Sequence, residues 1–190
     1  MKKILCVLLL LFTGCSSKTS MIEIQKHVYV EKEFKDSWLE TNEFGDSYIK
    51  EELQGGYHYH FDQQFLEIFF NTGGKIELYN YSIKKNDLII SGEMIPPKTI
   101  RLVHPHLDNV TSEGVIIHEL GHYFDEKHQF SSSKQFTELY KKYRTLFNQK
   151  TKKEYFAECF KEYVGGHQEK VKPFHSYMKT ITQKIRQKNK

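Results

Sequence analysis

The sequence predicts an α+β domain with a small sheet in its first half, a metal-binding helix near its middle and a helical C-terminal half. Alternating apolar residues between positions 75 and 104 are typical of strands, whereas apolar residues at three-four spacing beyond position 131 are typical of helices. The stretch Val115–Asp125 joins the two halves and carries two histidines one helical turn apart. With 190 residues, 38% of them hydrophobic and 14% aromatic, the chain can bury the core of one domain.

The first 14 residues resemble a bacterial export signal and are not expected to belong to the fold. Lys2 and Lys3 precede the apolar run Ile4–Phe12, which is too short to span a bilayer, because a spanning helix needs about 20 residues. Small residues immediately before Cys15 resemble the lipobox of bacterial lipoproteins. This resemblance implies cleavage before Cys15, lipidation of that residue and anchorage to the cell membrane outside the cytoplasm. A plain signal peptide of a secreted protein is the alternative.

We therefore divide the chain into a signal peptide, a polar tether and one folded domain: residues 1–14, 15–20 and 21–190. Cleavage removes two lysines and no acid, which lowers the formal net charge from +4 by two. A charge this near to neutral does not favour nucleic acid as a partner. The remaining cysteines are Cys15 and Cys159. A lipidated Cys15 leaves Cys159 without a partner, so no disulfide framework is predicted.

Residues 21–61 carry the weakest pattern in the folded part of the chain. Four β-branched residues suggest an early strand, namely Ile22, Ile24, Val28 and Val30. The alternation in Tyr57–Phe61 would place His58 and His60 on one face of a second strand. A second metal site is one interpretation of this pair, and a solvated polar face is the other.

Residues 62–104 predict a helix followed by three strands. Asp62 is expected to cap a helix over Gln63–Asn71, which the following glycine pair ends. Alternation then predicts strands over Lys75–Ile83 and Asp87–Ser91, and a third over Thr99–His104 after the Pro96-Pro97 break.

The third of these strands comes just before the metal-binding helix. As an edge strand it would be able to pair with an extended peptide by β-augmentation. His104 and His106 lie at its end as further metal-ligand candidates, although the proline between them favours a simple turn.

The central helix carries the HExxH pattern from His118 to His122, within an otherwise apolar run. Residues at i and i+4 share one helix face, so both imidazoles can bind one metal ion. Glu119 lies about 100° further round the helix, where it can reach the rim of the site without being a ligand. Burying these three ionisable groups without a metal would cost several kcal/mol. The pattern therefore predicts a zinc site in which Glu119 takes a proton from water.

Two helices are expected after the metal-binding helix. Ser131–Ser133 can cap a helix over Gln135–Phe147, and a second helix over Lys152–Val164 ends at a glycine pair. Glu154 and Glu158 lie one turn apart on the second helix, and spacing alone leaves either one as a third metal ligand.

The HELGH motif followed by the stretch Glu154–Phe160 resembles the zinc metallopeptidases related to anthrax toxin lethal factor, which include the secreted Pro-Pro endopeptidases. The resemblance extends over about residues 75–164 and implies a zincin-like fold with an edge strand before the metal helix. It implies that Glu154 is the third zinc ligand. It also implies that Glu158 and Asp125 are supporting carboxylates, Glu158 by orienting a ligand.

One residue departs from the family's pattern. The family carries a tyrosine seven residues before its third ligand, hydrogen-bonded to the zinc-bound water, and Phe147 stands at that position here. Tyr143 or Tyr140 on the same expected helix is an alternative source of this hydroxyl. Loss of one such donor costs on the order of 10²–10³ in rate, so the departure concerns efficiency and not zinc binding.

The sequence thus predicts a zinc-dependent endopeptidase that acts on peptides or proteins outside the cytoplasm. Zn²⁺ on His118, His122 and Glu154 is its expected cofactor, and Glu119 its general base. The alternative is a surface-anchored binding protein with a structural or vestigial zinc site. Retention of Glu119 argues against that alternative, because a structural site has no use for a general base.

Overall fold

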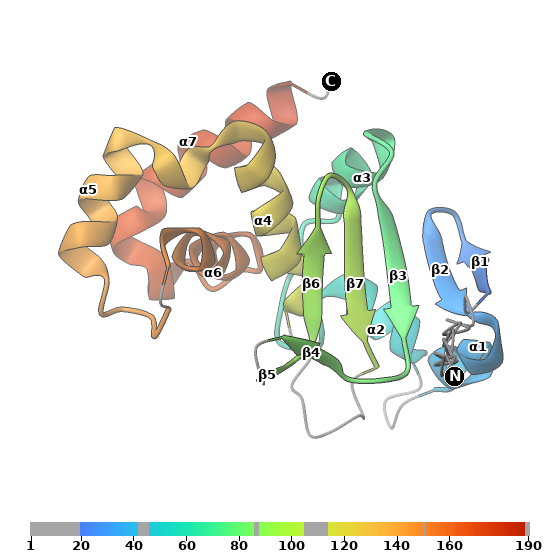
Figure 1. Ribbon diagram of the computed structural model, residues 1–190. Helices are drawn as coiled ribbons and strands as arrows, with labels where there is room; N and C mark the ends of the chain where they lie inside the picture. The colour runs from blue at the N-terminus through green and yellow to red at the C-terminus, as the bar shows by residue number, and fades with distance from the viewer. Residues whose placement is uncertain (1–19, 42–45, 86–87, 105–113, 150, 189–190) are drawn as a thin grey trace, which may run out of the picture.

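A mixed sheet and a group of C-terminal helices pack on opposite sides of helix α4 (Val115–His128), which is the centre of the molecule (Figure 1). The computed structural model describes residues 20–41, 46–85, 88–104, 114–149 and 151–188. The predicted signal peptide, most of the tether with Cys15, Asp87 and His106 lie outside these residues. The α+β class predicted from the sequence is confirmed.

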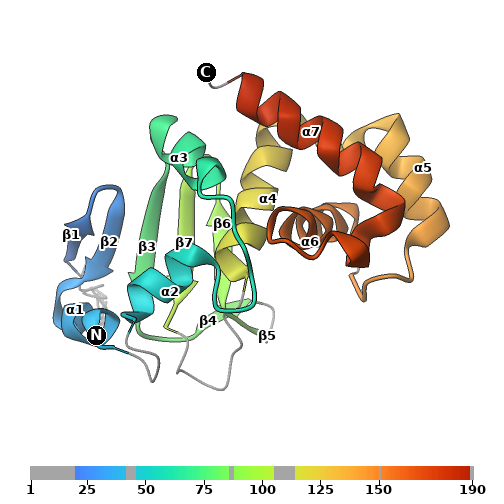
Figure 2. The same ribbon diagram turned by 180° about the vertical axis from the view of Figure 1, so that it is seen from behind.

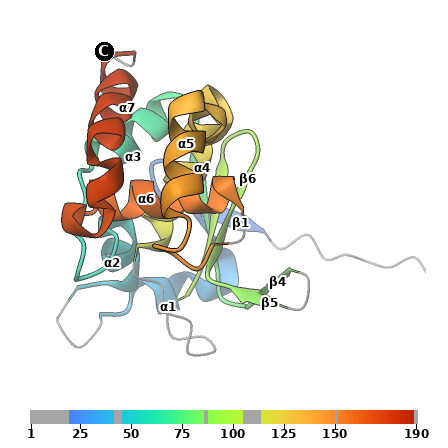
Figure 3. The ribbon, with the colours of Figure 1, turned by 90° about the vertical axis from the view of Figure 1, so that its left-hand side faces the viewer.

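Within the described residues, the first half of the chain supplies all the strands and three short helices. The strands are β1 (Met21–Gln25), β2 (Val28–Glu31), β3 (Lys75–Tyr79), β4 (Ile83–Lys85), β5 (Leu88–Ile90), β6 (Gly92–Ile95) and β7 (Thr99–Val103). The helices are α1 (Lys35–Leu39), α2 (Tyr48–Gln54) and α3 (Gln64–Asn71), and a 3₁₀ turn, η1 (Lys32–Phe34), precedes the first. Strands β4 and β5 form a separate hairpin that projects from the body of the molecule (Figure 3).

The five-stranded sheet has the order β1-β2-β3-β7-β6, with β2, β3 and β7 parallel and the two outer strands antiparallel. The prediction that Thr99–His104 forms an edge strand is therefore wrong, because β7 lies between β3 and β6. The Pro96-Pro97 pair, interpreted from sequence as a break, is the turn of a hairpin. That turn folds β6 back on β7, with Met94 opposite Ile100, and β6 becomes the edge.

The two faces of the sheet differ as strand alternation requires. Ile76, Leu78, Ile100 and Leu102 are fully buried on the face that α2 and α3 cover (Figure 2). The opposite face carries cross-strand ion pairs. Arg101 on β7 binds Glu77 of β3 at 3.2 Å and Glu93 of β6 at 3.4 Å. One-sided burial of this kind fixes the register, because a one-residue slip would exchange the two faces.

The second half of the chain is helical. After α4 come η2 (Phe130–Ser132), α5 (Lys134–Tyr143), α6 (Lys152–Val164), η3 (Gln168–Phe174) and α7 (His175–Gln187). The predicted helix over Lys152–Val164 is confirmed at both ends, and Ser133 caps α5 by accepting a bond from the Phe136 N–H at 3.1 Å. Helix α5 ends at Tyr143 and not at Phe147.

Helices α4 and α6 pack against each other at a glycine. A Cβ on Gly121 would lie 2.9 Å from the Cα of Ala157, so any larger residue would push the two backbones apart. Gly121 is the fourth residue of the HELGH motif, and Ala157 lies between Glu154 and Glu158. The glycine therefore sets how near α6 can bring its carboxylates to the histidines of α4.

The predicted strand over Tyr57–Phe61 is wrong, since this segment has no strand pairing and lies in turns. Residues 57–61 form instead an irregular segment, the 57–61 strap, that lies between Gly114 at the start of α4 and Gly165 at the end of α6. Its His60 N–H donates to the carbonyl of Gly165 at 2.8 Å, and the Gly114 N–H just before α4 donates to the carbonyl of Gly55 at 2.9 Å. These tertiary hydrogen bonds hold the segment in place, where the alternation of its residues had indicated a strand.

Two further observations complete the fold. Cys159 is free and buried within the described part of the chain. Among the described residues, no helix has the length and apolar character needed to cross a membrane.

Candidate metal centre

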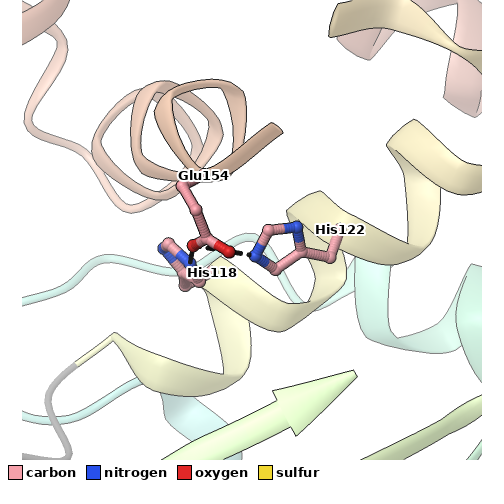
Figure 4. A group of neighbouring side chains, drawn as sticks. All are labelled: His118, His122 and Glu154. Carbon is pink, nitrogen blue, oxygen red and sulfur yellow. Dashed lines mark hydrogen bonds and ion pairs between the residues drawn. The ribbon is translucent and has the colours of Figure 1, made fainter. Parts of the chain in front are cut away.

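Three side chains from two helices converge at the crossing of α4 and α6 (Figure 4). Oε2 of Glu154 lies 3.3 Å from Nε2 of His118 and 3.3 Å from Nε2 of His122. One donor atom from each residue falls within 4.8 Å of the others. Spacing alone left Glu154 and Glu158 equivalent, but the structure places Glu154 between the two Nε2 atoms.

The first turn of α6 holds Glu154 in this position. Thr151 caps the helix, and its hydroxyl accepts a bond from the Glu154 N–H at 3.2 Å. The next residue, Tyr155, is fully buried and donates its hydroxyl to the Tyr143 carbonyl at 2.5 Å. Glu154 lies about 100° round the helix from this anchored neighbour, and 46% of its side chain is exposed.

Glu158 lies behind His118, on the side away from the other two donors. Its Oε2 is 3.3 Å from Nδ1 of His118, and its Oε1 is 2.7 Å from Nζ of Lys161. A carboxylate on Nδ1 keeps the proton on that nitrogen and leaves Nε2 with a lone pair for a metal. This is the orienting position that the sequence resemblance implied for Glu158.

Glu119 is buried, with 6% of its surface exposed, and lies beside the cluster without belonging to it. The backbone N–H of Met94, on edge strand β6, donates to its carboxylate. Burial raises the pKa of Glu119, and the two neighbouring histidines offset only part of that rise. The group therefore combines a fixed orientation with a basicity above that of an ordinary glutamate.

The contacts within the cluster raise the pKa of His118 and lower the pKa values of Glu154 and Glu158. Burial alone would lower the pKa of His118, but Glu154, Glu158 and Glu119 outweigh it and raise that pKa to about 9. The two histidine contacts hold the pKa of Glu154 well below its usual range. Burial opposes the same effect at Glu158, yet the bonds from His118 and Lys161 still leave its pKa lowered. Without a metal, a proton on His118 would hold these carboxylates together.

An open cleft of about 560 Å³ lies over the cluster. Edge strand β6 and its flanking residues form one wall, α4 forms the floor, and the start of α6 forms the other wall. The cleft is lined by Ile90, Gly92, Glu93, Met94, Pro96, His118, Glu119, His122, Asp125, Glu126, Thr151, Lys153 and Glu154. A smaller hollow of about 220 Å³ adjoins it between β6 and Lys161.

Asp125 lies on the cleft wall, one turn beyond His122. Its two carboxylate oxygens accept bonds from the N–H and the hydroxyl of Ser131, both at 2.6 Å. These bonds fix the turn that leads from α4 into η2. The contact with Ser131 could not be foreseen from sequence, because it depends on the tight turn at Gln129.

The tyrosines considered as replacements at Phe147 lie away from the cleft. Tyr140 and Phe147 pack on the ring of Tyr155 at centroid distances of 5.1 and 5.3 Å, and Tyr143 packs on Phe174 at 6.1 Å. No tyrosine lines the cleft among the described residues. Sequence reasoning missed Thr151 and Lys153, which line the cleft beside Glu154. The sequence signal that could have identified them is their position at the start of helix α6, next to Glu154.

The other histidine candidates among the described residues do not gather into a second cluster. His104 is buried between the rings of Trp38 and Tyr48, and its Nε2 lies 3.2 Å from the Ser37 carbonyl oxygen. His58 and His60 belong to the irregular 57–61 strap. Within the described part of the chain, His118, His122 and Glu154 are the one group of potential metal donors.

No protein-family model matches this chain, and a search of curated proteins finds no match either. The function proposed below therefore rests on the residues of the site and on their geometry.

Proposed function

We propose that this protein is a zinc-dependent endopeptidase of zincin-like fold, related to the lethal factor group. The observation that carries the proposal is the convergence of His118, His122 and Glu154 at an open cleft, with Glu119 buried beside them. Two imidazoles and one carboxylate are a donor set of catalytic zinc sites.

The three donors fit zinc by their chemistry and their arrangement. Their donor atoms lie close enough for one ion, and they converge on the cleft and not on a sealed core. A structural zinc site would instead surround the ion with four protein ligands. When bound here, zinc would supply a Lewis acid for a carbonyl oxygen and would lower the pKa of a water molecule.

Glu119 is suited to the proton transfers of peptide hydrolysis. Its carboxylate is aimed by the Met94 N–H, and burial makes it a better base than an exposed glutamate. It accepts a proton from the attacking water and then delivers that proton to the nitrogen of the leaving amine. It is not among the three clustered donors, so it can perform this exchange while they hold the metal.

Edge strand β6 gives the cleft a way to bind a polypeptide. In the described part of the chain β7 is the one strand paired with β6, and residues of β6 line the cleft. An extended peptide can pair with such an edge through main-chain bonds, which brings its carbonyl groups past the metal cluster. The β-augmentation first assigned to Thr99–His104 is therefore proposed for Gly92–Ile95.

The proposed place of action is outside the cytoplasm, with the protein held to the membrane by lipid on Cys15. This part of the proposal rests on the sequence of residues 1–20. The peptide partner approaches from solvent, because the cleft over α4 is open.

Zinc content and peptide cleavage, measured on the same preparation, test the function. The purified protein is expected to hold about one zinc per chain and to cleave members of an unstructured peptide library. A chelator should abolish cleavage, and added zinc should restore it. Zinc without cleavage of any library member would support the alternative of a surface binding protein with a structural or vestigial zinc site.

A further inference from the structure

Behind the metal cluster, a row of alternating charges runs along one side of α6. It begins at Nδ1 of His118, continues through Glu158 to Nζ of Lys161 at 2.7 Å, and reaches Glu162 at 3.7 Å. Lys161 is one turn beyond Glu158 on the helix, so the two side chains meet on the same face. Nothing in the sequence motifs assigns a role to Lys161.

Lys161 is held in place from several sides and is not an ordinary surface lysine. Only 16% of its side chain is exposed, and its ammonium lies 5.8 Å from the centroid of the Tyr59 ring. Two glycines provide the room for this arrangement. A Cβ on Gly114 would lie 2.9 Å from both Lys161 and Tyr59, and one on Gly165 would lie 2.2 Å from Tyr59.

Glu162, the next acid in the row, does not depend on Lys161 alone. It is buried, and it accepts a bond from the Tyr59 hydroxyl at 3.0 Å. It also pairs with Nδ1 of His167 and Nζ of Lys170, both at 3.0 Å. Of the two carboxylates that pair with Lys161, Glu158 is the nearer, at 2.7 Å against 3.7 Å for Glu162.

We propose that Lys161 is a positioning residue for the metal centre: its ammonium fixes the carboxylate of Glu158 against Nδ1 of His118, and so fixes the His118 ring with Nε2 toward the other donors. Glu154 and Glu162 lie one helical turn before and after Glu158 on α6, and like charges at this spacing repel. Without the ammonium, repulsion from these two carboxylates would turn the Glu158 carboxylate away from Nδ1 of His118. That movement removes the acceptor that holds the His118 tautomer.

The inference rests on the proposed zinc site, and its test measures zinc affinity and not activity. Zinc dissociation constants are measured on the purified full protein by competition with a chromophoric chelator. Lys161→Met is expected to raise the constant by roughly 10–100-fold, the effect typical of losing a group that orients a metal ligand. Lys161→Arg, which keeps a cation within reach of Glu158, should restore affinity to within about threefold of the wild type.

Lys170→Met is the matched control, because it removes one positive charge from the same network but contacts Glu162 and not Glu158. Its zinc affinity should stay within about twofold of the wild type. A loss equal to that of Lys161→Met would show a general charge effect and would overturn the positioning role.

A double-mutant cycle with Glu158→Ala separates the two remaining explanations. If Lys161 acts through Glu158, adding Lys161→Met to Glu158→Ala should cause no further loss of affinity. If the two losses multiply, Lys161 acts independently and the proposal is wrong. Thermal unfolding of each zinc-free variant checks that the fold is kept; Lys161→Gln replaces Lys161→Met if the latter does not fold. Zinc binding without peptide cleavage would contradict the proposed function while leaving this test intact.

Discussion

At the scale of single residues, the proposed function assigns metal binding and proton transfer to different groups. His118 and His122 direct their Nε2 atoms at Glu154 from one face of α4, and Glu119 faces the cleft from a position one residue further along. Helical geometry alone produced this separation, which is why it was predictable from five residues of sequence.

Glu119→Gln should separate metal binding from catalysis. Glutamine keeps the size and most hydrogen bonding of the carboxylate but cannot take a proton from water. The variant should fold and bind about one zinc per chain, and kcat should fall by a factor on the order of 10²–10⁴. The measurements are zinc content and turnover of a cleaved peptide. Wild-type turnover would refute the general-base role, and loss of zinc would show that Glu119 also acts as a ligand.

Glu154→Ala and Glu158→Ala should weaken zinc binding to different extents. Glu154 stands between the two Nε2 atoms, so its removal should abolish most zinc binding at micromolar protein. Glu158 contacts only Nδ1 of His118 within the cluster, so its removal should cost roughly 10–100-fold. Chelator competition measures both. The reverse ranking would make Glu158 the third ligand.

The zinc-free protein should lose stability as pH rises, because its cluster is held by protonated histidine. The folded-state pKa of His118 is about 9, against 6.5 for an unperturbed imidazole. This contribution is therefore complete below about pH 6.5 and is lost as pH rises through 9. The free energy of unfolding should fall by up to about 3 kcal/mol over that window. Urea denaturation in the presence of a chelator measures it, and His118→Ala should flatten the slope.

At the scale of elements, sequence predicted those structures whose signals are local. Helix α6 and the start of α5 were located correctly because Thr151 and Ser133 cap them through bonds within one turn. Strand order was not predictable in this way. Whether β7 lies in the centre or at the edge depends on the pairing of Thr99–Val103 with Lys75–Tyr79, some 24 residues away, and no local pattern encodes that choice.

The segment at residues 57–61 shows how tertiary contacts override a local pattern. Its alternation of aromatic and histidine residues is typical of a strand, yet it forms the strap between Gly114 and Gly165. Tyr59 packs into space that two glycines leave free. Such a fit is invisible in sequence, because each glycine is distant from Tyr59 along the chain.

Gly121→Ala should disturb the contact between α4 and α6. Alanine would gain about 1 kcal/mol of helix propensity, but its Cβ would lie 2.9 Å from backbone at Ala157, a clash that no side-chain rotation relieves. Overpacking costs about 1–3 kcal/mol, so the variant should be less stable and should bind zinc more weakly as Glu154 moves away. Chemical denaturation and zinc titration measure the two effects. A more stable variant with unchanged zinc affinity would exclude this role for the glycine.

At the scale of the whole molecule, the site forms where the half of the chain that contains the sheet packs against the helical half. Sequence patterns describe each half by itself and not how the two pack together. The sheet contributes β6 and the Met94 N–H, the centre contributes α4, and the helical half contributes Glu154 and Glu158. The three clustered residues His118, His122 and Glu154 were predictable as a group from motifs and from a resemblance. The cleft walls were not, because they require the hairpin between β6 and β7.

Cys15→Ala should release the protein from the membrane or leave its signal uncleaved. Each buried CH₂ of an acyl chain contributes about 0.8 kcal/mol to membrane binding, so two or more chains hold a protein firmly. Fractionation of cells and mass spectrometry of the N-terminus measure the outcome. A wild-type protein that is wholly soluble with an unmodified N-terminus would exclude the anchor.

The edge strand that we propose as the peptide-binding edge also exposes the protein to pairing with its own copies. An unprotected edge is a template for aggregation, and proteins limit that risk with short strands, prolines and charges. Strand β6 has all three: it is four residues long, it ends at Pro96-Pro97, and it carries Glu93. Such an edge is long enough for one extended segment in the cleft and too short to nucleate a growing sheet.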